Sequence, residues 1–352
     1  MPCIALVDLA WRHRDAASDV EPRVLEVLRT GRYVGGPFVD EVERTAATWF
    51  GRAGAVGVNS GTDALTLALQ AVGVRPGDEV IVPALSFFAT AGAVRALGAE
   101  PVVVNVGADG CLDPEAACAA VTGRTRTVVP VHLFGTLARA PECGVPVVDD
   151  AAQAVGGTPP RSLGTLTAVS AYPTKTWGGA GDGGFVLGDD PDALERVRLL
   201  ANHGHTEDGF TEPAGQPARN SRLDALQAAV LLGHAPHLAA RVARRRALAA
   251  RYDAALPPGV SALPRDPGSP VHHYVALVPD RDRVAAALCA RGVESRVYYP
   301  RPLHEEPALA RAAHTPVADD LCRRVLALPV HAGLSDEDAD VVLEALHAAV
   351  RR

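Results

Sequence analysis

The sequence has 352 residues, of which 48% are hydrophobic and 21% charged, and its formal net charge is −7. This length predicts two domains or one large α/β unit, and the apolar content excludes a disordered chain. The acidic balance argues against general nucleic-acid binding, and no apolar run approaches the roughly 18 residues of a membrane span. The first residues, MPCIALVDLAWRHRD, have no basic leader before a sustained apolar stretch, so we expect no signal peptide and a cytoplasmic protein.

From about residue 53, short β-like runs alternate with helical ones. The predicted strands cover residues 55–59, 78–83, 101–106, 125–134 and 145–150, and the predicted helices cover 60–73 and 87–98. The strands are dense in β-branched residues without strict alternation, which is typical of parallel strands buried on both faces. The pattern therefore predicts a mainly parallel sheet with helices on both sides.

The pattern changes to a long helical stretch at residues 220–256, which Pro236 is expected to interrupt. A turn-rich segment at 257–270 follows. We then expect a strand at 271–279, a helix at 281–292, a strand at 293–300 and a last helix from about residue 335. This organisation predicts a large domain over residues 1–235 and a smaller C-terminal α/β domain over residues 236–352. The basic stripe at 240–252 is interpreted as a solvated helix face with carboxylate partners.

The cysteines and histidines of the sequence are not expected to form disulfides or metal sites. Cysteines stand at positions 3, 111, 118, 143, 289 and 322, with no CxxC pair. This scatter favours reduced thiols over a disulfide framework or a zinc site. His203 and His205 lie in a glycine loop without a clear third ligand, so we expect no metal there. His272 and His273 precede a strand and are expected at the domain interface.

Lys175 is the one lysine in the sequence, whereas the other 33 of the 34 basic residues are arginines. Arginine supplies charge as well as lysine does, but only lysine deprotonates readily enough to form a Schiff base or move a proton. Lys175 is therefore the best nucleophile candidate, and the alternative is a surface lysine without a role. Its position between a small-residue strand and a glycine run favours the first interpretation, because glycines permit close backbone approach to a ligand.

The glycine run offers a competing motif. Gly179, Gly181 and Gly184 fit G-x-G-x-x-G, the dinucleotide-binding pattern. That pattern requires a helix immediately after the glycines, and here the strand-like GFVLGDD follows instead. The sequence therefore disfavours a Rossmann dehydrogenase.

Two further segments place polar groups where predicted strands end. In NSGTDAL, Ser60, Gly61 and Thr62 lie where a helix begins, which suits a phosphate, although one hydroxyl could merely cap the helix. In VPVVDD, Asp149 and Asp150 end an apolar strand at the sheet edge where ligands bind. A carboxylate buried there needs a cationic partner, and a pyridinium nitrogen would be one. A helix cap from one aspartate remains compatible with that role for the other.

With these motifs in order along the chain, the sequence resembles the DegT/DnrJ/EryC1/StrS sugar aminotransferases, which are pyridoxal-phosphate enzymes of the aspartate-aminotransferase fold (fold type I). The resemblance runs from GRYVGGPFVDEVE (31–43) to VLALPVHAGLSDED (325–338). It is carried by NSGTDAL, GDEVIVPALSFFAT, VPVHLFG, DDAAQA, SAYPTKTWGGAGDGG and YYPRPLH.

The resemblance implies a role for each matching residue. Lys175 would form the internal aldimine with pyridoxal 5'-phosphate and then move the proton between cofactor and substrate carbons. Asp150 would pair with the pyridine nitrogen and Gln153 would contact the phenolic oxygen of the ring. Phe87, or less favourably Phe88, would stack on the ring. Gly61, Thr62 and Ser170 would contact the phosphate. Asn220 would reach the phosphate of the neighbouring subunit's cofactor, which implies a homodimer with shared active sites.

The implied reaction is a ping-pong transfer of an amino group from an amino acid, L-glutamate by family analogy, to a ketosugar. The GDGG after the lysine resembles members that act on nucleotide-linked 3-keto-6-deoxyhexoses. A 4-keto sugar or a cyclitol ketone remains an alternative within the class, and a non-catalytic regulatory cofactor-binding relative is the alternative outside it. Ala171 and Trp177 depart from the usual motif and would reshape the pocket. A lysine rather than a histidine at position 175 disfavours the related dehydratases.

Overall fold

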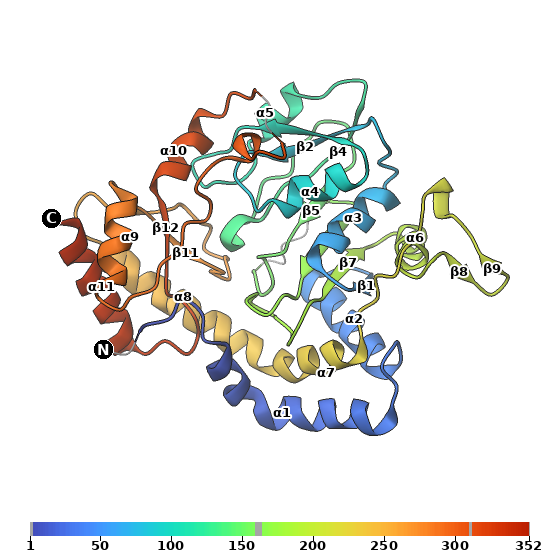
Figure 1. Ribbon diagram of the computed structural model, residues 1–352, viewed down its shortest axis with the longest axis horizontal. Helices are drawn as coiled ribbons and strands as arrows, with labels where there is room; N and C mark the ends of the chain where they lie inside the picture. The colour runs from blue at the N-terminus through green and yellow to red at the C-terminus, as the bar shows by residue number, and fades with distance from the viewer. Residues whose placement is uncertain (1–2, 159–163, 310–311, 352) are drawn as a thin grey trace.

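A central β-sheet organises the larger part of the molecule (Figure 1). The computed structural model describes residues 3–158, 164–309 and 312–351. The strands are β1 (Gly54–Val58), β2 (Glu79–Pro83), β3 (Glu100–Val104), β4 (Thr125–Val128), β5 (Val148–Asp150), β6 (Leu166–Ser170) and β7 (Gly184–Gly188). They lie in the orders β1-β7-β6-β5 and β3-β2-β4, and parallel bridges from Val128 to Val147 and from Val131 to Asp150 join the two groups. Since β7 runs antiparallel to β1 and β6 while the other pairs are parallel, the predicted mainly parallel α/β sheet is confirmed.

Helices cover both faces of this sheet. They are α1 (Leu9–Thr30), α2 (Pro37–Phe50), α3 (Gly61–Ala71), α4 (Ala89–Ala96), α5 (Pro114–Ala119), α6 (Pro191–Ala201) and α7 (Ala225–His234). Successive residues of a strand point to opposite faces. In β7, Val186 joins the core with α3 and α6, whereas Phe185 and Leu187 join the core with α2 and α7. Burial on both faces explains why these strands show no polar alternation in sequence.

The C-terminal part is a second, smaller α/β unit. Its elements are α8 (Leu238–Ala255), β10 (Ser261–Ala262), β11 (Tyr274–Leu277), α9 (Arg281–Cys289), α10 (Pro316–Arg324), β12 (Val325–Leu328) and α11 (Asp336–Val350). β11 pairs antiparallel with β10 and with β12. A 3₁₀ turn at Ala235–His237 separates α7 from α8, so the expected interruption at Pro236 is confirmed. The domain boundary predicted at this turn stays a prediction, and Ile4 near the N-terminus bridges to Val293 in the C-terminal part.

Three predictions about local structure need correction. The strand expected at 293–300 is wrong, because Val293 and Arg296 form isolated bridges to two different partners. The strand expected at 125–134 ends at Val128, before a turn at Leu133–Gly135. No helix was expected before residue 53, where the structure has α1 and α2.

The basic stripe on α8 is solvated only in part. Arg244 and Arg251 pair with Asp336 and Asp340 of α11, as expected of a surface face with carboxylate partners. Arg241 and Arg245, however, are buried. The helix packs these two guanidinium groups against the rest of the molecule, so the stripe is not simply a solvated face.

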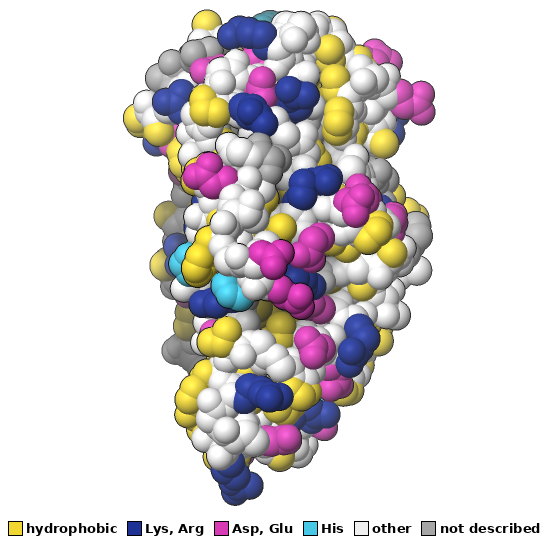
Figure 2. Space-filling model, turned by 90° about the vertical axis from the view of Figure 1, so that its right-hand side faces the viewer, with side chains coloured by type: hydrophobic (Ala, Val, Ile, Leu, Met, Phe, Trp, Pro, Cys, Tyr) yellow, Lys and Arg dark blue, Asp and Glu magenta, His cyan; other side chains and the backbone are white. Residues whose placement is uncertain are grey.

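A two-stranded hairpin, β8 (His205–Thr206) and β9 (Gly209–Phe210), extends beside α6 at the right of Figure 1. Figure 2 views the molecule from that side, where acidic and basic side chains are interspersed with hydrophobic ones. This face therefore carries no continuous basic surface of the kind that binds a nucleic-acid backbone. None of the helices in the described part of the chain is long and apolar enough to cross a membrane.

The cysteine prediction is wrong for one pair. Cys118 in α5 and Cys143 in the loop before β5 form a disulfide, with their Cα atoms 4.9 Å apart. Packing of α5 against this loop at the edge of the sheet brings the two residues together, although 25 positions separate them. Cys3, Cys111, Cys289 and Cys322 are not part of a disulfide.

We therefore expect thiol titration of the unreduced, denatured protein to find four free thiols, and six after reduction. The double variant Cys118→Ser, Cys143→Ser should lose about 2–4 kcal/mol in free energy of unfolding, because its unfolded chain is no longer cross-linked. Cys3→Ser, which changes an exposed thiol, serves as the control. Six free thiols without reductant would contradict the pairing.

Candidate active site

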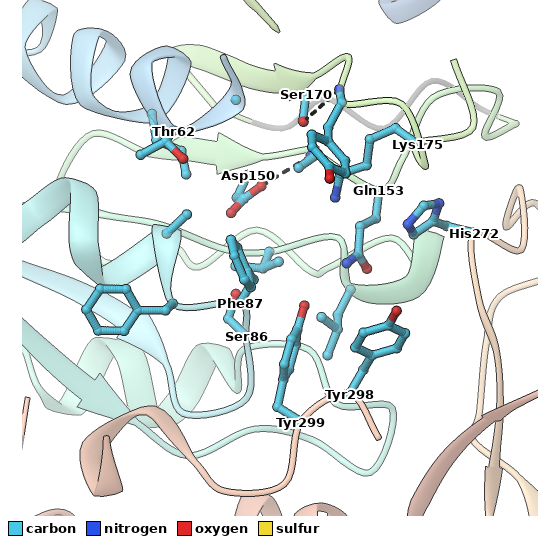
Figure 3. Close-up of a pocket in the computed structure, with 18 of the residues that line it drawn as sticks. Thr62, Ser86, Phe87, Asp150, Gln153, Ser170, Lys175, His272, Tyr298 and Tyr299 are labelled. Atoms are coloured by element: carbon cyan, nitrogen blue, oxygen red, sulfur yellow. Dashed lines mark hydrogen bonds between the residues drawn. The ribbon is translucent and has the colours of Figure 1, made fainter. Parts of the chain in front are cut away.

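Polar side chains from several strand ends meet in one cavity between the sheet and the C-terminal part (Figure 3). The cavity has a volume of about 790 Å³. The residues that it gathers, out of those predicted from sequence, are Gly61, Thr62, Phe87, Asp150, Gln153, Ser170 and Lys175. The structure thus brings together residues up to 114 positions apart, which lie at the ends of β5 and β6 and on the segments that follow β1, β2, β5 and β6. These connections lie at the carboxyl ends of parallel strands, where α/β sheets bind ligands.

Lys175 lies in the connection between the antiparallel neighbours β6 and β7. A compact turn holds its backbone, since its N–H donates to the carbonyl of Tyr172 over 2.8 Å. Gly178 tightens the same turn, because a Cβ there would come within 2.6 Å of the carbonyl oxygens of Tyr172 and Pro173. Trp177 anchors the connection from below by donating from Nε1 to the carbonyl of Leu231 in α7. The turn therefore holds the lysine against the wall of the cavity.

Burial sets the chemistry of Lys175. Removal from water lowers the pKa of its amine, and the nearby Asp150 carboxylate opposes this shift only in part. A lowered pKa leaves more of the amine neutral and nucleophilic at a given pH. Lys175, which the sequence singles out as the one lysine, thus has the lowered pKa that is typical of a reactive amine.

Asp150 is the buried carboxylate of the site. One oxygen accepts from the Thr90 hydroxyl over 2.8 Å and the other from the N–H of Ala152 over 3.1 Å. Burial nonetheless raises the pKa of Asp150. A cationic group beside Asp150 in the cavity would favour the ionised form of this carboxyl group. A protonated pyridine nitrogen is such a group.

The start of α3 and the end of β6 form a narrow polar corner. Ser60 caps α3, because its hydroxyl accepts from the N–H of Asp63 over 3.1 Å. The cap leaves Thr62 with its side chain in the cavity. A Cβ at Gly61 would come within 2.5 Å of the Ser170 side chain, so glycine is needed for the two segments to meet. A helix N-terminus with hydroxyls from Thr62 and Ser170 suits a phosphate.

Phe87 and Gln153 provide a ring face and an amide. Phe87 is 60% exposed and Phe88 39% exposed, and both border the cavity. The Gln153 side-chain oxygen accepts from the N–H of Phe134 over 2.5 Å, and a side-chain hydrogen bond to Tyr299 also holds the amide. An open aromatic face, an orientated amide, the carboxylate and the amine together fit a phosphorylated pyridine aldehyde.

Sequence reasoning missed an aromatic wall across the cavity. His272 and His273, expected at the domain interface, also border the cavity, and their rings lie 4.2 Å apart. His273 stacks on Tyr298 at 4.5 Å, and Tyr299 continues the wall toward Phe87 at 6.2 Å. Burial lowers the pKa of His273 to about 3 and the pKa of His272 well below its usual value, so both rings are neutral. The two tyrosines of the YYPRPLH motif were the feature of the sequence that could have indicated this aromatic wall.

Two sequence features lie elsewhere. Asn220 is exposed and does not border this cavity. Of the competing glycines, Gly179 and Gly181 approach the Gln227 side chain, and the strand β7 rather than a helix begins at Gly184. The structure therefore offers no helix N-terminus for a dinucleotide after the glycine run.

Comparison with known proteins agrees with this geometry. The DegT/DnrJ/EryC1/StrS aminotransferase family matches residues 15–347. The chain belongs to this family. It is 38% identical to a dTDP-3-amino-3,4,6-trideoxy-alpha-D-glucose transaminase of Streptomyces venezuelae, over 100% of this chain and 97% of that protein. It is also 35% identical to a pleiotropic regulatory protein of Geobacillus stearothermophilus, over 97% of each.

Solved structures show the same fold. DesV of S. venezuelae in complex with a ketimine intermediate superposes with a TM-score of 0.93 at 36% identity, with both chains covered completely. NtdA of Bacillus subtilis with bound cofactor PMP has a TM-score of 0.93 at 27% identity, over 100% of this chain and 86% of that one. The family depends on pyridoxal phosphate, and this chain is an aminotransferase with the type I fold.

The lowered pKa of Lys175 predicts the pH dependence of its covalent capture of pyridoxal phosphate. The neutral fraction of an ordinary lysine, with a pKa of 10.5, falls about tenfold per pH unit below that value. Capture by Lys175 should level off at a lower pH than this. Asp150→Asn should move the plateau to still lower pH, because the carboxylate that favours the ammonium form is gone.

Stopped-flow absorbance from pH 6 to 10 measures this rate, with the exposed Asp192→Asn as the control. A wild-type rate that rises tenfold per unit throughout would contradict the lowered pKa.

Proposed function

We propose that this aminotransferase transfers an amino group from an amino acid, L-glutamate, to a nucleotide-linked 3-keto-6-deoxyhexose by a ping-pong mechanism. The observation that carries the proposal is the single lysine of the chain, partly buried and with a depressed pKa, in the same cavity as Asp150. A cytoplasmic location stays a prediction.

The residues that border the cavity support a position for each part of pyridoxal phosphate. The phosphate would lie at the N-terminus of α3 with Gly61, Thr62 and Ser170. Phe87 would cover one face of the ring, Gln153 would donate to its phenolic oxygen and Asp150 would face its nitrogen. When bound, the cofactor supplies an aldehyde that condenses with amines and a ring that stabilises negative charge at the neighbouring carbon.

Lys175 and Asp150 then divide the work. Lys175 would hold the cofactor at rest, and its amine, when free, would move a proton between the cofactor carbon and the substrate carbon. Its lowered pKa suits this transfer, because the base must be neutral near physiological pH. Asp150 would face the ring nitrogen and, as a carboxylate, would favour its protonated, electron-poor form.

The acceptor would occupy the part of the cavity bordered by His273, Tyr298 and Tyr299. Neutral rings such as these favour the apolar faces of a sugar over a charged group. The name of the S. venezuelae relative, a 3-amino-3,4,6-trideoxyglucose transaminase, supports a 3-keto sugar without a 6-hydroxyl. A 4-keto sugar and a cyclitol ketone are the alternatives within the class, and a panel of nucleotide ketosugars distinguishes them.

The regulatory relative favours a second candidate, a non-catalytic cofactor-binding protein. A protein that only senses the cofactor needs its phosphate corner and ring face. It has no use for an amine of depressed pKa beside a carboxylate. The presence of both in this cavity supports catalysis.

We further propose that two copies of the chain share their active sites. Asn220 is exposed and lies outside the cavity of its own chain, as expected of a residue that serves the neighbouring subunit. Leu25, Leu28, Tyr33 and Val34, which follow one another on α1 and the turn after it, expose apolar surface that a second subunit would cover.

The amino-donor half-reaction provides a direct test. The protein loaded with pyridoxal phosphate should be yellow, and L-glutamate should bleach that absorbance while 2-oxoglutarate is released in equal amount. Lys175→Ala and Lys175→Arg should show neither the covalent adduct nor the bleaching. A loaded wild-type protein that responds to no amino acid would refute catalysis and favour the regulatory candidate.

Subunit mixing tests the shared site. Lys175→Ala and Asn220→Ala homodimers should each have strongly reduced activity. In a mixed dimer one site has lost both residues and the other has both. Mixing the two variants should therefore restore roughly a quarter of wild-type activity, since half of the dimers are mixed and each has one intact site. No recovery in dimers shown by mass spectrometry to have exchanged subunits would contradict the sharing.

A further inference from the structure

A partly buried arginine outside the cavity contacts the backbone of Lys175. Arg12 lies in the first turns of α1, and its Nη1 donates to the backbone carbonyl of Lys175 over 3.0 Å. Its Nη2 reaches the carbonyl of Gly179 over 3.5 Å. One guanidinium group therefore spans both ends of the short segment that holds the lysine.

The position of Arg12 is unfavourable for the free energy of folding, because a cation is partly removed from water there. Among the described residues no carboxylate lies within ion-pair distance of Arg12, and burial with the nearby Arg241 lowers its pKa to about 10. A buried cation without an anionic partner destabilises the fold unless its donors are satisfied. Here the acceptors include the carbonyls of Lys175 and Gly179, so the same hydrogen bonds that satisfy the guanidinium also hold the lysine segment.

Arg12 is itself fixed by its neighbours. Arg241 of α8 donates to the Arg12 carbonyl over 3.1 Å and to Asp15 over 2.8 Å, which anchors the first turns of α1. Asp8 caps the helix by accepting from the N–H of Trp11 over 2.7 Å. The guanidinium therefore acts from a rigid helix rather than from a free side chain.

Other contacts also hold this segment, among them the hydrogen bonds from the Lys175 N–H to the Tyr172 carbonyl and between the Thr176 hydroxyl and His272 Nδ1 over 3.3 Å. Gln227 accepts from the N–H of Ala180 over 2.9 Å, and Trp177 is held at Leu231. In the described part of the chain, Arg12 is the side chain that donates to the Lys175 backbone. Loss of its donors would leave the Lys175 carbonyl without this partner and remove one restraint on the lysine backbone.

We propose that Arg12 is a positioning residue for Lys175, which fixes the lysine backbone so that the amine reaches the cofactor and both substrate carbons. The inference rests on the proposed role of Lys175. A displacement of about 1 Å can reduce the rate of a reaction about 100-fold. The effect should therefore appear in the steps that Lys175 performs and spare the binding of the amino donor.

Arg12→Gln tests the proposal against Arg14→Gln, which removes an exposed arginine from the same helix. For Arg12→Gln, at saturating pyridoxal phosphate, we expect kcat to fall about 10- to 100-fold while KM for the donor stays within about threefold. Covalent capture of the cofactor should slow by a similar factor. Arg14→Gln should stay within about twofold of wild type in both measurements.

Partial rescue separates positioning from general stability. Arg12→Lys should recover part of kcat, because an ammonium group reaches one carbonyl but not both. Millimolar methylguanidinium should accelerate Arg12→Gln and leave Arg14→Gln unchanged. If Arg12→Gln does not fold, Arg12→Lys alone carries the test and should show kcat reduced at least about threefold with an unchanged melting temperature.

The proposal is overturned if kcat and the capture rate of the folded Arg12 variant remain within twofold of wild type, or if the Arg14 control loses as much. A wild-type protein that captures no cofactor at Lys175 refutes the proposed function instead, so the two failures are distinguishable.

Discussion

The site depends on burying an amine and a carboxylate in one cavity without a direct ion pair between them. Lys175 and Asp150 each have a pKa moved toward the neutral form by loss of water. Removing Lys175 and Asp150 from water costs folding free energy. The sheet edge and the local turns nonetheless hold both groups in place without a ligand. Such preorganised, destabilised groups are typical of a site built for chemistry rather than for stability.

The surrounding structure works to hold these two groups apart and in place. Asp150 is fixed by Thr90 and the Ala152 N–H, and Lys175 by the turn between β6 and β7. Farther out, Phe134 and Val271 are non-glycine residues with positive φ angles of 58° and 51°, and the N–H of His272 donates to the Phe134 carbonyl. Backbone strain of this kind persists only where packing enforces it, and here it places the neutral histidines beside the lysine.

Much of this arrangement could be predicted from sequence because it is local. The strand ends, the glycine at position 61 and the lysine all lie within short motifs whose residue types determine their chemistry. For the aromatic wall, the YYP motif was a local signal, but not for its contact with His273. The Arg12 contact could not be predicted this way, because it joins segments 163 positions apart. The Cys118–Cys143 disulfide was missed for the same reason, and the expected strand at 293–300 failed because its residues pair with two separate segments.

The central claim is that Lys175 is the residue that bonds the cofactor. Borohydride reduction of the protein loaded with pyridoxal phosphate, followed by peptide mass spectrometry, tests it most directly, since no other lysine side chain competes. We predict one phosphopyridoxyl group on Lys175, and its disappearance when L-glutamate is added before the borohydride. A label found only on the N-terminal amine, or no label on protein shown to bind the cofactor, would contradict the account.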